Sequence, residues 1–486
     1  MILYQWFTGI NRQYTLFRLF RTSNLAYNKE RSRLMANQVD PPSTWFAQQS
    51  NITMVQGVLV EDNCIVDVNP ATGEVISRVP CSTFEELDDK VKKSRDAFDT
   101  WSVMPSAERI QLLRDGLVKL KEQHELLVQL IVREMGKPRA EAEEEMEGAV
   151  QKNNFMDILE NAQEPERHGQ SLVVRQALGV VVIMSPWNFP VDEILLLALP
   201  ALGAGNTVIV KPSEVTPECG ALTVSSLASV LPPNVFQLAQ GDGRVGSHLV
   251  SHPLVDMVAM TGSSATGRKI LSAAAPSLKR VVLELGGKDP MVVFEDADLA
   301  KAAKDAVDYS LSNTGQVCCS VERVFVAEPV LDVFENMVLE YAKTFKVGSG
   351  MDPDVKVGPL VSSLQLVHVE TQVQAAVQDG AELLYQSDVP AEIPGTSFYP
   401  VTVLSKVTPE MDVCRSETFG PVVTLCGFDG SEAAGVRLAN DTEYGLAGSV
   451  YTADLERAQR VAARMNCGQV GINCYALNEM DVACPW

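Results

Sequence analysis

The chain has 486 residues, of which 46% are hydrophobic, and it carries a formal net charge of −22. This length and hydrophobic content are enough for a large buried core and predict two domains. The acidic balance argues against a nucleic-acid-binding surface. No apolar run reaches the roughly 18 residues that a membrane span needs, since Pro190, Asp192 and Glu193 interrupt the longest one.

Neither the cysteines nor the histidines have the spacing of a known metal-binding motif. Ten cysteines are scattered along the chain without a Cys-x-x-Cys pair, a pattern typical of a reducing compartment. His248 and His252 are four residues apart but lack the glutamate of a His-Glu-x-x-His zinc helix. We therefore predict no metal site.

Residues 1–35 differ in character from the rest because basic residues outnumber acidic ones there. This amphipathic stretch resembles an organelle transit peptide, although it contains few serines. The alternative is an extension upstream of a true start at Met35. We leave the stretch out of the fold prediction, and we expect a mitochondrial or cytoplasmic location.

The first predicted elements are two strands, at residues 65–68 and 74–79, joined by an Asn-Pro-Ala-Thr-Gly turn. Apolar residues at helical spacing then predict helices from Val91 to Ile131. Gly136-Lys137-Pro138 ends one of these helices, and the acidic stretch 140–149 begins another. We expect these helices to act as scaffold.

From Val180 onward, buried strands alternate with helices, as in a doubly wound parallel sheet. The predicted strands are 180–184, 207–210, 235–238, 257–260, 281–285, 291–294 and 324–326. Polar or glycine-rich stretches follow five of them, at 185–188, 211–214, 241–243, 261–263 and 284–287. Ligands bind at the carboxyl ends of the strands in such sheets. One crevice is therefore predicted to hold all five stretches.

Two further stretches suggest ligand contacts. No Gly-x-Gly-x-x-Gly is present, but residues 262–267 follow a strand and open a helix whose free N–H groups could bind a phosphate. The alternative is a turn with a serine N-cap. Glu417 and Phe419, beside a Gly-Pro turn, are predicted to line a pocket, although turn chemistry alone also explains them.

Cys318 is the candidate nucleophile, because a thiolate is strongly nucleophilic and the preceding Gly315-Gln316 turn allows close approach of the backbone. The alternative is a buried, inert cysteine. Glu284 is the candidate base, since it interrupts an apolar strand just before two glycines. Desolvation there is expected to raise its pKa towards the range of a general base, unless it simply points into water.

From about Ile65 to Trp486, the chain resembles the NAD(P)-dependent aldehyde dehydrogenase superfamily. The motifs, in family order, are Pro186-Trp187-Asn188-Phe189-Pro190, Lys211-Pro212-Ser213-Glu214, Thr261-Gly262-Ser263, Glu284-Leu285-Gly286-Gly287-Lys288, Gly315-Gln316-Val317-Cys318 and Glu417-Thr418-Phe419-Gly420-Pro421. The resemblance implies an α/β fold: a Rossmann-like doubly wound parallel-sheet cofactor domain, an α/β catalytic domain and a small β oligomerisation flap. It allots 60–165 and 178–283 to the NAD-binding domain, 284–465 to the catalytic domain, and 166–177 with 466–486 to the flap.

The resemblance also implies roles for single residues. Cys318 would be the nucleophile, Glu284 the general base and Asn188 the amide that stabilises the oxyanion. The residues implied in cofactor binding are Trp187, Lys211, Glu214, Gly241, Gly262, Ser263, Gly267, Leu285, Glu417 and Phe419. NAD is expected over NADP, because the Glu214 carboxylate can accept a hydrogen bond from a ribose 2′-hydroxyl and would repel a 2′-phosphate.

The expected partner is a small-molecule aldehyde, whose identity the sequence does not indicate. Two alternatives are a sibling enzyme that transfers the acyl group to coenzyme A and a non-catalytic truncated homologue. Members of the first kind tend to lack a base matching Glu284. Family members form dimers or tetramers and continue beyond the position of Trp486 with a closing strand, so either the chain is a fragment or its assembly is impaired.

Overall fold

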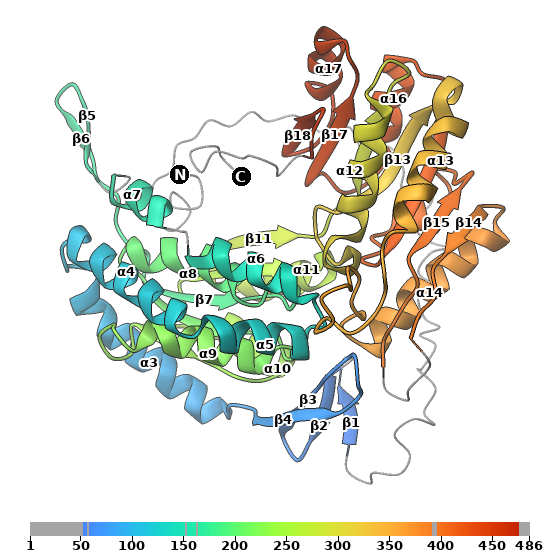
Figure 1. The fold of residues 1–486 in the computed structure, drawn as a ribbon. Coiled ribbons are helices and arrows are strands. Elements are labelled where there is room, and N and C mark those ends of the chain that lie inside the picture. The colour runs from blue at the N-terminus through green and yellow to red at the C-terminus, as the bar shows by residue number, and fades with distance from the viewer. Residues whose placement is uncertain (1–51, 56–57, 151–152, 162–163, 391–395, 476–486) are drawn as a thin grey trace.

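The computed structural model describes residues 52–55, 58–150, 153–161, 164–390 and 396–475. Two α/β bodies lie side by side, one blue to green and one yellow to red, with a small sheet below the first (Figure 1). The predictions for residues 1–35 and for the chain after residue 475 fall outside the described residues.

The small sheet is antiparallel, in the order β1 (Ile52–Val55), β2 (Val58–Glu61), β3 (Cys64–Val68) and β4 (Val75–Pro80). Its β3–β4 pair is the predicted hairpin, with Ile65 opposite Val79. Gly73 has a φ of 74° in the connecting turn and donates its N–H to the Asn69 carbonyl oxygen at 2.7 Å. A residue other than glycine is strained in this conformation.

The predicted helical region forms α3 (Phe84–Trp101), α4 (Ser106–Glu122), α5 (His124–Glu134) and α6 (Arg139–Val150), and a further helix, α7 (Asn153–Asn161), follows outside the predicted stretches. Their apolar faces share one buried core with the next sheet, in which Leu113 and Ile131 pack in the same cluster as Val181. As predicted, the helix before Gly136-Lys137-Pro138 ends there and an acidic helix follows.

The central sheet of the first body has five parallel strands in the order β11 (Arg280–Leu285), β10 (Met257–Gly262), β7 (Val180–Met184), β8 (Thr207–Lys211) and β9 (Phe236–Leu238). The helices that alternate with these strands are α8 (Asp192–Gly203), α9 (Pro217–Ala228), α10 (Gly243–Ser251) and α11 (Ser264–Ala274). The buried valine-rich runs suit a sheet that helices cover on both faces. Because neighbouring strands are parallel, the five predicted strand-end stretches leave the sheet at one edge.

The second body contains a separate sheet of seven strands, in the order β14 (Glu382–Gln386), β15 (Thr402–Ser405), β16 (Val422–Phe428), β13 (Val321–Ala327), β12 (Asp289–Val293), β17 (Ala447–Tyr451) and β18 (Gln469–Ile472). Only β14 runs antiparallel to its neighbour. The principal helices of this body are α12 (Leu299–Leu311), α13 (Leu331–Ala342), α14 (Ser363–Gln378), α16 (Glu432–Ala439) and α17 (Leu455–Ala462). The predicted strands 291–294 and 324–326 therefore do not extend the first sheet.

Strand β13 is longer than the predicted strand 324–326. The prediction began too late because two charged residues, Glu322 and Arg323, are buried near the start of the strand. The Arg323 guanidinium donates hydrogen bonds to the carbonyl oxygens of Lys288, Leu438 and Ala439 at 2.8 to 3.0 Å. These contacts come from segments distant in sequence, so the local pattern gives no sign of them.

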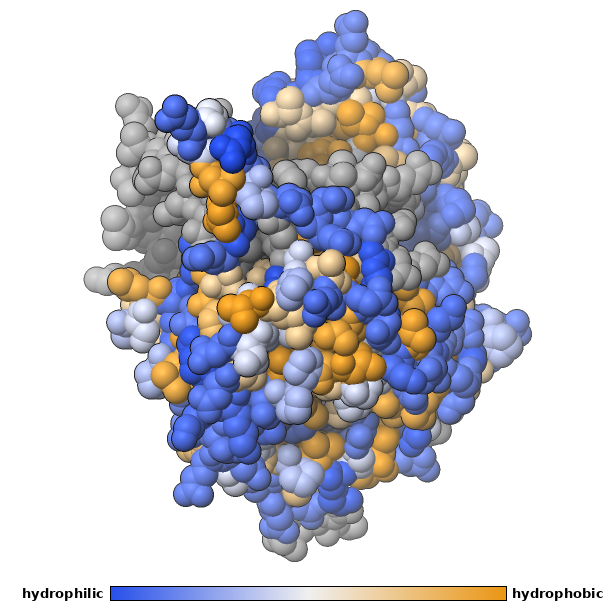
Figure 2. All heavy atoms as spheres, turned by 90° about the vertical axis from the view of Figure 1, so that its left-hand side faces the viewer, coloured by the Kyte–Doolittle hydropathy of each residue, from blue (hydrophilic) through white to orange (hydrophobic). Residues whose placement is uncertain are grey.

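A two-stranded hairpin, β5 (Glu166–His168) and β6 (Ser171–Val173), projects from the first body (Figure 1). Leu172 on this hairpin is 53% exposed, and Val174 just after it is 51% exposed. The face of the molecule on this side is largely polar, with apolar side chains gathered near its middle (Figure 2). None of the helices in the described part of the chain is long and apolar enough to cross a membrane.

Candidate active site

The loop that carries Cys318 has an unusual backbone. It follows the short helix η2 (Ser312–Gly315), in which Asn313, Thr314 and Gly315 have positive φ angles of 52°, 61° and 72°. A β-branched residue such as threonine is strained there by roughly 1–3 kcal/mol, and such strain persists only where neighbouring structure enforces it. A Cβ on Gly315 would lie 2.0 Å from the Gly420 carbonyl oxygen, so only glycine fits that position.

Hydrogen bonds hold this loop against the segment that contains Asn188. The Asn313 side-chain N–H group donates to the carbonyl oxygens of Asn188 and Gln316, both at 3.0 Å. The Asn188 side-chain amide donates to the same Gln316 oxygen at 3.1 Å. Asn188 thus lies beside the loop of the candidate nucleophile. Its amide carries a second hydrogen that can stabilise an oxyanion.

Cys318 is half-buried, and Cys319 is almost fully buried next to it. The hydrogen bond to Cys319 and burial raise the pKa of the Cys318 thiol, and the nearby carboxylates of Glu193 and Asp289 add to this effect. The Tyr475 hydroxyl lies 2.8 Å from the Cys319 carbonyl oxygen and 3.1 Å from its sulfur. Cys318 is therefore a thiol that must lose a proton before it can attack.

Two carboxylates lie beside Thr261 at the end of the first sheet. Glu284 is half-buried in β11, opposite Thr261 of β10. The Thr261 hydroxyl donates to Glu193 at 2.9 Å, and the charge of Glu193 acts on Cys318. The sequence marked Glu193 only as a break in an apolar run, so its place in the site was missed. A raised pKa for Glu284 stays a prediction.

The two glycines after β11 allow two other segments to approach. A Cβ on Gly286 would lie 2.4 Å from both carboxylate oxygens of Glu417, and one on Gly287 would lie 2.3 Å from the Cys318 carbonyl oxygen. The Gly287 N–H donates to Glu417 at 3.1 Å. Burial, together with the charge of Glu322, raises the pKa of Glu417 to about 8. The end of the strand that carries Glu284, the Cys318 loop and Glu417 thus come together at this pair of glycines.

Glu322 holds the segment that contains Glu417 and Phe419 in place. This carboxylate accepts the backbone N–H groups of Thr418 and Phe419 at 2.8 and 3.0 Å and forms a buried ion pair with Lys288. The Phe419 ring meets Trp187 edge-on, with 5.3 Å between ring centroids. Trp187 and Phe419 come from different bodies, so these two predicted cofactor residues lie where the bodies meet.

The remaining predicted cofactor residues follow the strand ends of the first sheet. Lys211 ends β8, and its ammonium group donates to Glu214 at 2.8 Å and to the Pro212 carbonyl oxygen at 2.9 Å. Ser263 is the N-cap of α11 and accepts the Thr266 N–H at 3.2 Å, as the simpler alternative proposed. Capping leaves other N–H groups of that first turn for an anion.

Three glycines, one of which packs against Leu285, allow close packing at this edge of the sheet. Gly241 has a φ of 147°, and a Cβ there would lie 2.3 Å from the Val245 side chain. A Cβ on Gly262 would lie 2.9 Å from the Met260 sulfur, and one on Gly267 would lie 2.9 Å from the Leu285 side chain. These features fit the parts of a dinucleotide. The Lys211–Glu214 pair and the Glu417 carboxylate suit ribose hydroxyls, the N-terminus of α11 suits a pyrophosphate, and the rings of Trp187 and Phe419 suit a flat ring.

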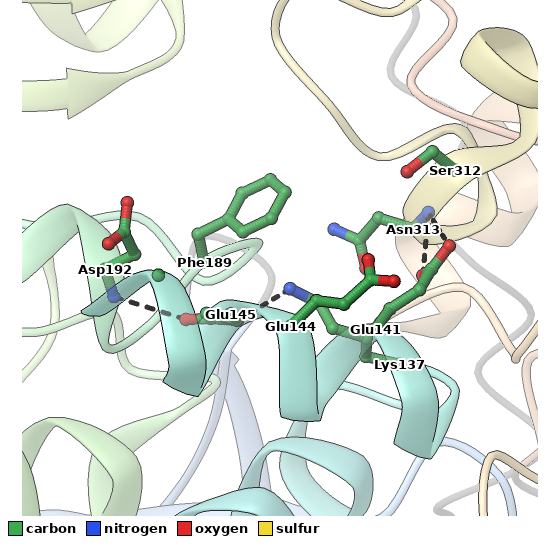
Figure 3. A pocket seen from close by; sticks show the side chains of 9 residues that line it. Lys137, Glu141, Glu144, Glu145, Phe189, Asp192, Ser312 and Asn313 are labelled. Atoms are coloured by element: carbon green, nitrogen blue, oxygen red, sulfur yellow. Dashed lines mark hydrogen bonds and ion pairs between the residues drawn. The ribbon is translucent and has the colours of Figure 1, made fainter. Parts of the chain in front are cut away.

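A cavity of about 290 Å³ lies beside the Cys318 loop (Figure 3). It is lined by Lys137, Glu141, Glu144, Glu145, Gly148, Phe189, Asp192, Ser312 and Asn313. Glu145 accepts the N–H groups of Val191 and Asp192 at the start of α8, and Glu141 accepts the Asn313 N–H at 2.9 and 3.1 Å. The expectation that the early helices are only scaffold is therefore wrong for α6, which lines a cavity and holds two site segments.

Residues 59–486 match the model of the Aldehyde dehydrogenase family. The mitochondrial succinate-semialdehyde dehydrogenase of Arabidopsis thaliana is 37% identical over 425 residues, which are 85% of this chain and 79% of that protein. The crystal structure of betaine aldehyde dehydrogenase from Staphylococcus aureus with NAD+ has a TM-score of 0.82 and 31% identity, covering 91% of this chain and 90% of that one. An E. coli NADP-dependent enzyme has a TM-score of 0.80 and 33% identity, covering 88% and 90% of the two chains. The chain therefore belongs to the aldehyde dehydrogenase family and is an NAD(P)-dependent enzyme that oxidises an aldehyde to a carboxylic acid.

Proposed function

We propose that Cys318, Asn188 and Glu284 carry out this oxidation through a thioester on Cys318. The observation that supports the proposal most is the hydrogen-bond network in which the Asn188 amide and Asn313 meet at the Gln316 carbonyl oxygen, two residues before Cys318. The Cys318 thiolate adds to the aldehyde carbon, and the Asn188 amide stabilises the oxyanion of the thiohemiacetal. Removing such a donor typically costs about 10²–10³ in rate. When NAD is bound, its nicotinamide ring accepts the hydride.

Glu284 then acts as the general base for hydrolysis. It deprotonates a water molecule, which attacks the thioester and releases the acid and the free thiol. Its half-buried position at the end of β11, one strand from Thr261, supports this role. Hydrolysis is therefore favoured over transfer of the acyl group to coenzyme A, which needs no such base.

We infer that residues 60–165 and 178–283 form the NAD-binding domain and residues 284–465 the catalytic domain. The residues assigned to the cofactor are the ten at the strand ends and at the meeting point of the two bodies: Trp187, Lys211, Glu214, Gly241, Gly262, Ser263, Gly267, Leu285, Glu417 and Phe419. Their support is the separation of the two sheets and the Trp187–Phe419 contact. NAD is the expected cofactor, with some use of NADP.

We further propose that the β5–β6 hairpin is part of a flap that joins copies of the chain into dimers or tetramers. The exposed side chains of Leu172 on a projecting hairpin and of Val174 just after it support this. Sedimentation of the protein and of a Leu172→Lys variant tests it, because equal masses would remove the hairpin from the interface. A mitochondrial or cytoplasmic location is tested by imaging a fusion of the whole chain.

The catalytic assignment is tested by comparing Cys318→Ala with Cys319→Ala, using propanal and NAD. Cys318→Ala should abolish NADH formation, while Cys319→Ala should retain most of it. Circular dichroism and thermal melts verify that both variants fold. Equal loss of activity in two folded variants would contradict the assignment of Cys318 as the nucleophile.

A further inference from the structure

We propose that the cavity beside the Cys318 loop selects aldehydes that carry a positively charged amino or alkylammonium group at the end remote from the carbonyl. The inference rests on the proposed function and extends it from aldehydes in general to one substrate class.

The charges that line the cavity are mostly negative. Glu144, Glu145 and Asp192 contribute carboxylates, Glu141 contributes one whose pKa burial raises to about 7, and Lys137 is the one basic residue among the lining residues. Lys137 is already neutralised, since its ammonium group lies 2.6 Å from Glu145 and both side chains are fully buried. The same ammonium group lies 3.8 Å from the centre of the Phe189 ring. An incoming cation therefore meets an excess of negative charge, which favours it electrostatically.

A second feature of the lining is independent of these acids. Asn313 is 2% exposed, and its side-chain oxygen accepts no hydrogen bond within the described part of the chain. The orientation of this amide is fixed, because its N–H group donates to two carbonyl oxygens. Buried polar atoms in folded proteins normally have a partner. An ammonium N–H of a ligand would supply the missing donor.

The position of the cavity suits the remote end of a substrate. Asn313 borders the cavity and also holds the Asn188 carbonyl oxygen, so one residue belongs to both the lining and the catalytic network. Phe189 and Asp192 of the lining follow Asn188 closely in the chain. Figure 3 shows the acids of α6 between the start of α8 and Asn313. A carbonyl group at Cys318 would place a short chain towards these acids.

Aldehydes with a carboxylate at the remote end should be poor substrates for the same reason. Their negative charge would meet the carboxylates of the lining, while the one lysine there is occupied by Glu145. Repulsion between like charges in a partly buried site lowers affinity and so discriminates between substrates.

The test compares substrates that differ in charge but not in shape. The pairs are 3-aminopropanal with butanal, and 4-(trimethylammonio)butanal with 5,5-dimethylhexanal, each measured as kcat/KM with NAD and with NADP. The cationic member should exceed its neutral partner at least tenfold in one or both pairs, and succinate semialdehyde should fall below butanal. Ratios at or below one in both pairs would overturn the proposal.

Substitutions in α6 test whether the cavity causes the preference for cationic aldehydes. Glu144→Gln should lower the ratio of kcat/KM for the preferred cationic aldehyde to that for butanal several-fold, because it removes a negative charge at the cavity that attracts only the cation. Glu147→Gln is the matched control, since Glu147 is an exposed acid on the same helix but does not line the cavity. Equal effects of the two substitutions on the cation preference would contradict the assignment.

A binding measurement separates this proposal from the catalytic one. If none of the aldehydes reduces NAD or NADP, the proposed function fails, and calorimetry with propylammonium on Cys318→Ala tests the cavity without catalysis. Saturable binding that Glu144→Gln weakens and Glu147→Gln does not would support the cavity assignment. Absence of binding together with absence of a cation preference would overturn it.

Discussion

At the scale of single residues, the site depends on carboxylates whose surroundings set their proton affinity. Glu417 is the clearest case, because burial and the charge of Glu322 raise its pKa to about 8. At pH 7 the free enzyme therefore holds Glu417 mainly neutral, although the Gly287 N–H favours the charged form. If Glu417 accepts hydrogen bonds from a ribose, its charged form is the better acceptor.

The affinity for NAD should consequently rise as the pH increases through about 8, by roughly tenfold, since about 1.4 kcal/mol corresponds to a factor of ten. The affinity rises with pH because, below the pKa of Glu417, a proton must leave the carboxyl group before NAD can bind to the charged form. Titration calorimetry between pH 7 and pH 9 measures this. Glu417→Gln should show little dependence on pH over the same range. A wild-type affinity that is flat, or that falls with pH, would remove Glu417 from the ribose contact.

Glu214 gives a second prediction at this scale, on cofactor choice. Its ion pair with Lys211 at 2.8 Å partly neutralises the carboxylate, so we expect preference for NAD rather than exclusion of NADP, on the order of 10–100-fold. Glu214→Ser should reduce the ratio of kcat/KM for NAD to that for NADP. A wild type that prefers NADP, or a ratio unchanged by the substitution, would show that Glu214 does not select the cofactor.

At the scale of elements, the positive-φ turn before Cys318 determines where the nucleophile lies. Gly315→Ala would place a Cβ 2.0 Å from the Gly420 carbonyl oxygen and should displace the loop. A displacement of about 1 Å can cost roughly 10² in rate, so kcat/KM should fall at least that far. Steady-state kinetics and denaturant unfolding separate lost activity from lost stability.

Gly430→Ala is the control for this substitution. Gly430 has a φ of 76°, close to the 72° of Gly315, but a Cβ there meets only ordinary contacts at 3.5 and 3.7 Å. It should lose about 1–2 kcal/mol of unfolding free energy through the left-handed backbone and keep its kcat/KM. Similar kinetics in the two alanine variants would mean that the Gly420 contact does not position Cys318.

Sequence patterns predicted the parts of the site that depend on local chemistry. The strand ends, the Gly286-Gly287 break and the Gly315-Gln316 turn can all be recognised from the types of neighbouring residues in the sequence. The contacts of Glu193 with Thr261 and of Tyr475 with Cys319 were missed, because their partners are 68 and 156 residues away. The lining role of α6 was missed for the same reason. Its acids look like a solvated helix face until the fold brings Asn313 and α8 against them.

At the scale of the whole molecule, the parallel sheet of the first body and the mixed sheet of the second end near one another, and the candidate site lies where they meet. The chain passes from β11 of the first sheet to β12 of the second through Gly286 and Gly287, which contact Glu417 and the Cys318 loop. Trp187 of one body touches Phe419 of the other. The alternation of strands and helices alone predicted one sheet, whereas the family resemblance implied a separate catalytic domain; the structure has two sheets, with Glu284 at the end of β11 in the first and Cys318 in the loop before β13 of the second.

The central claim is that a thioester forms on Cys318 and that Glu284 is needed to hydrolyse it. The most direct measurement mixes Glu284→Gln with propanal and NAD, follows NADH, and then quenches with acid for peptide mass spectrometry. We expect a burst of about one NADH per active site, slow turnover afterwards, and a propionyl group on Cys318. Steady turnover at the wild-type rate, or NADH formation with the acyl group on Cys319 or on no cysteine, would contradict this claim.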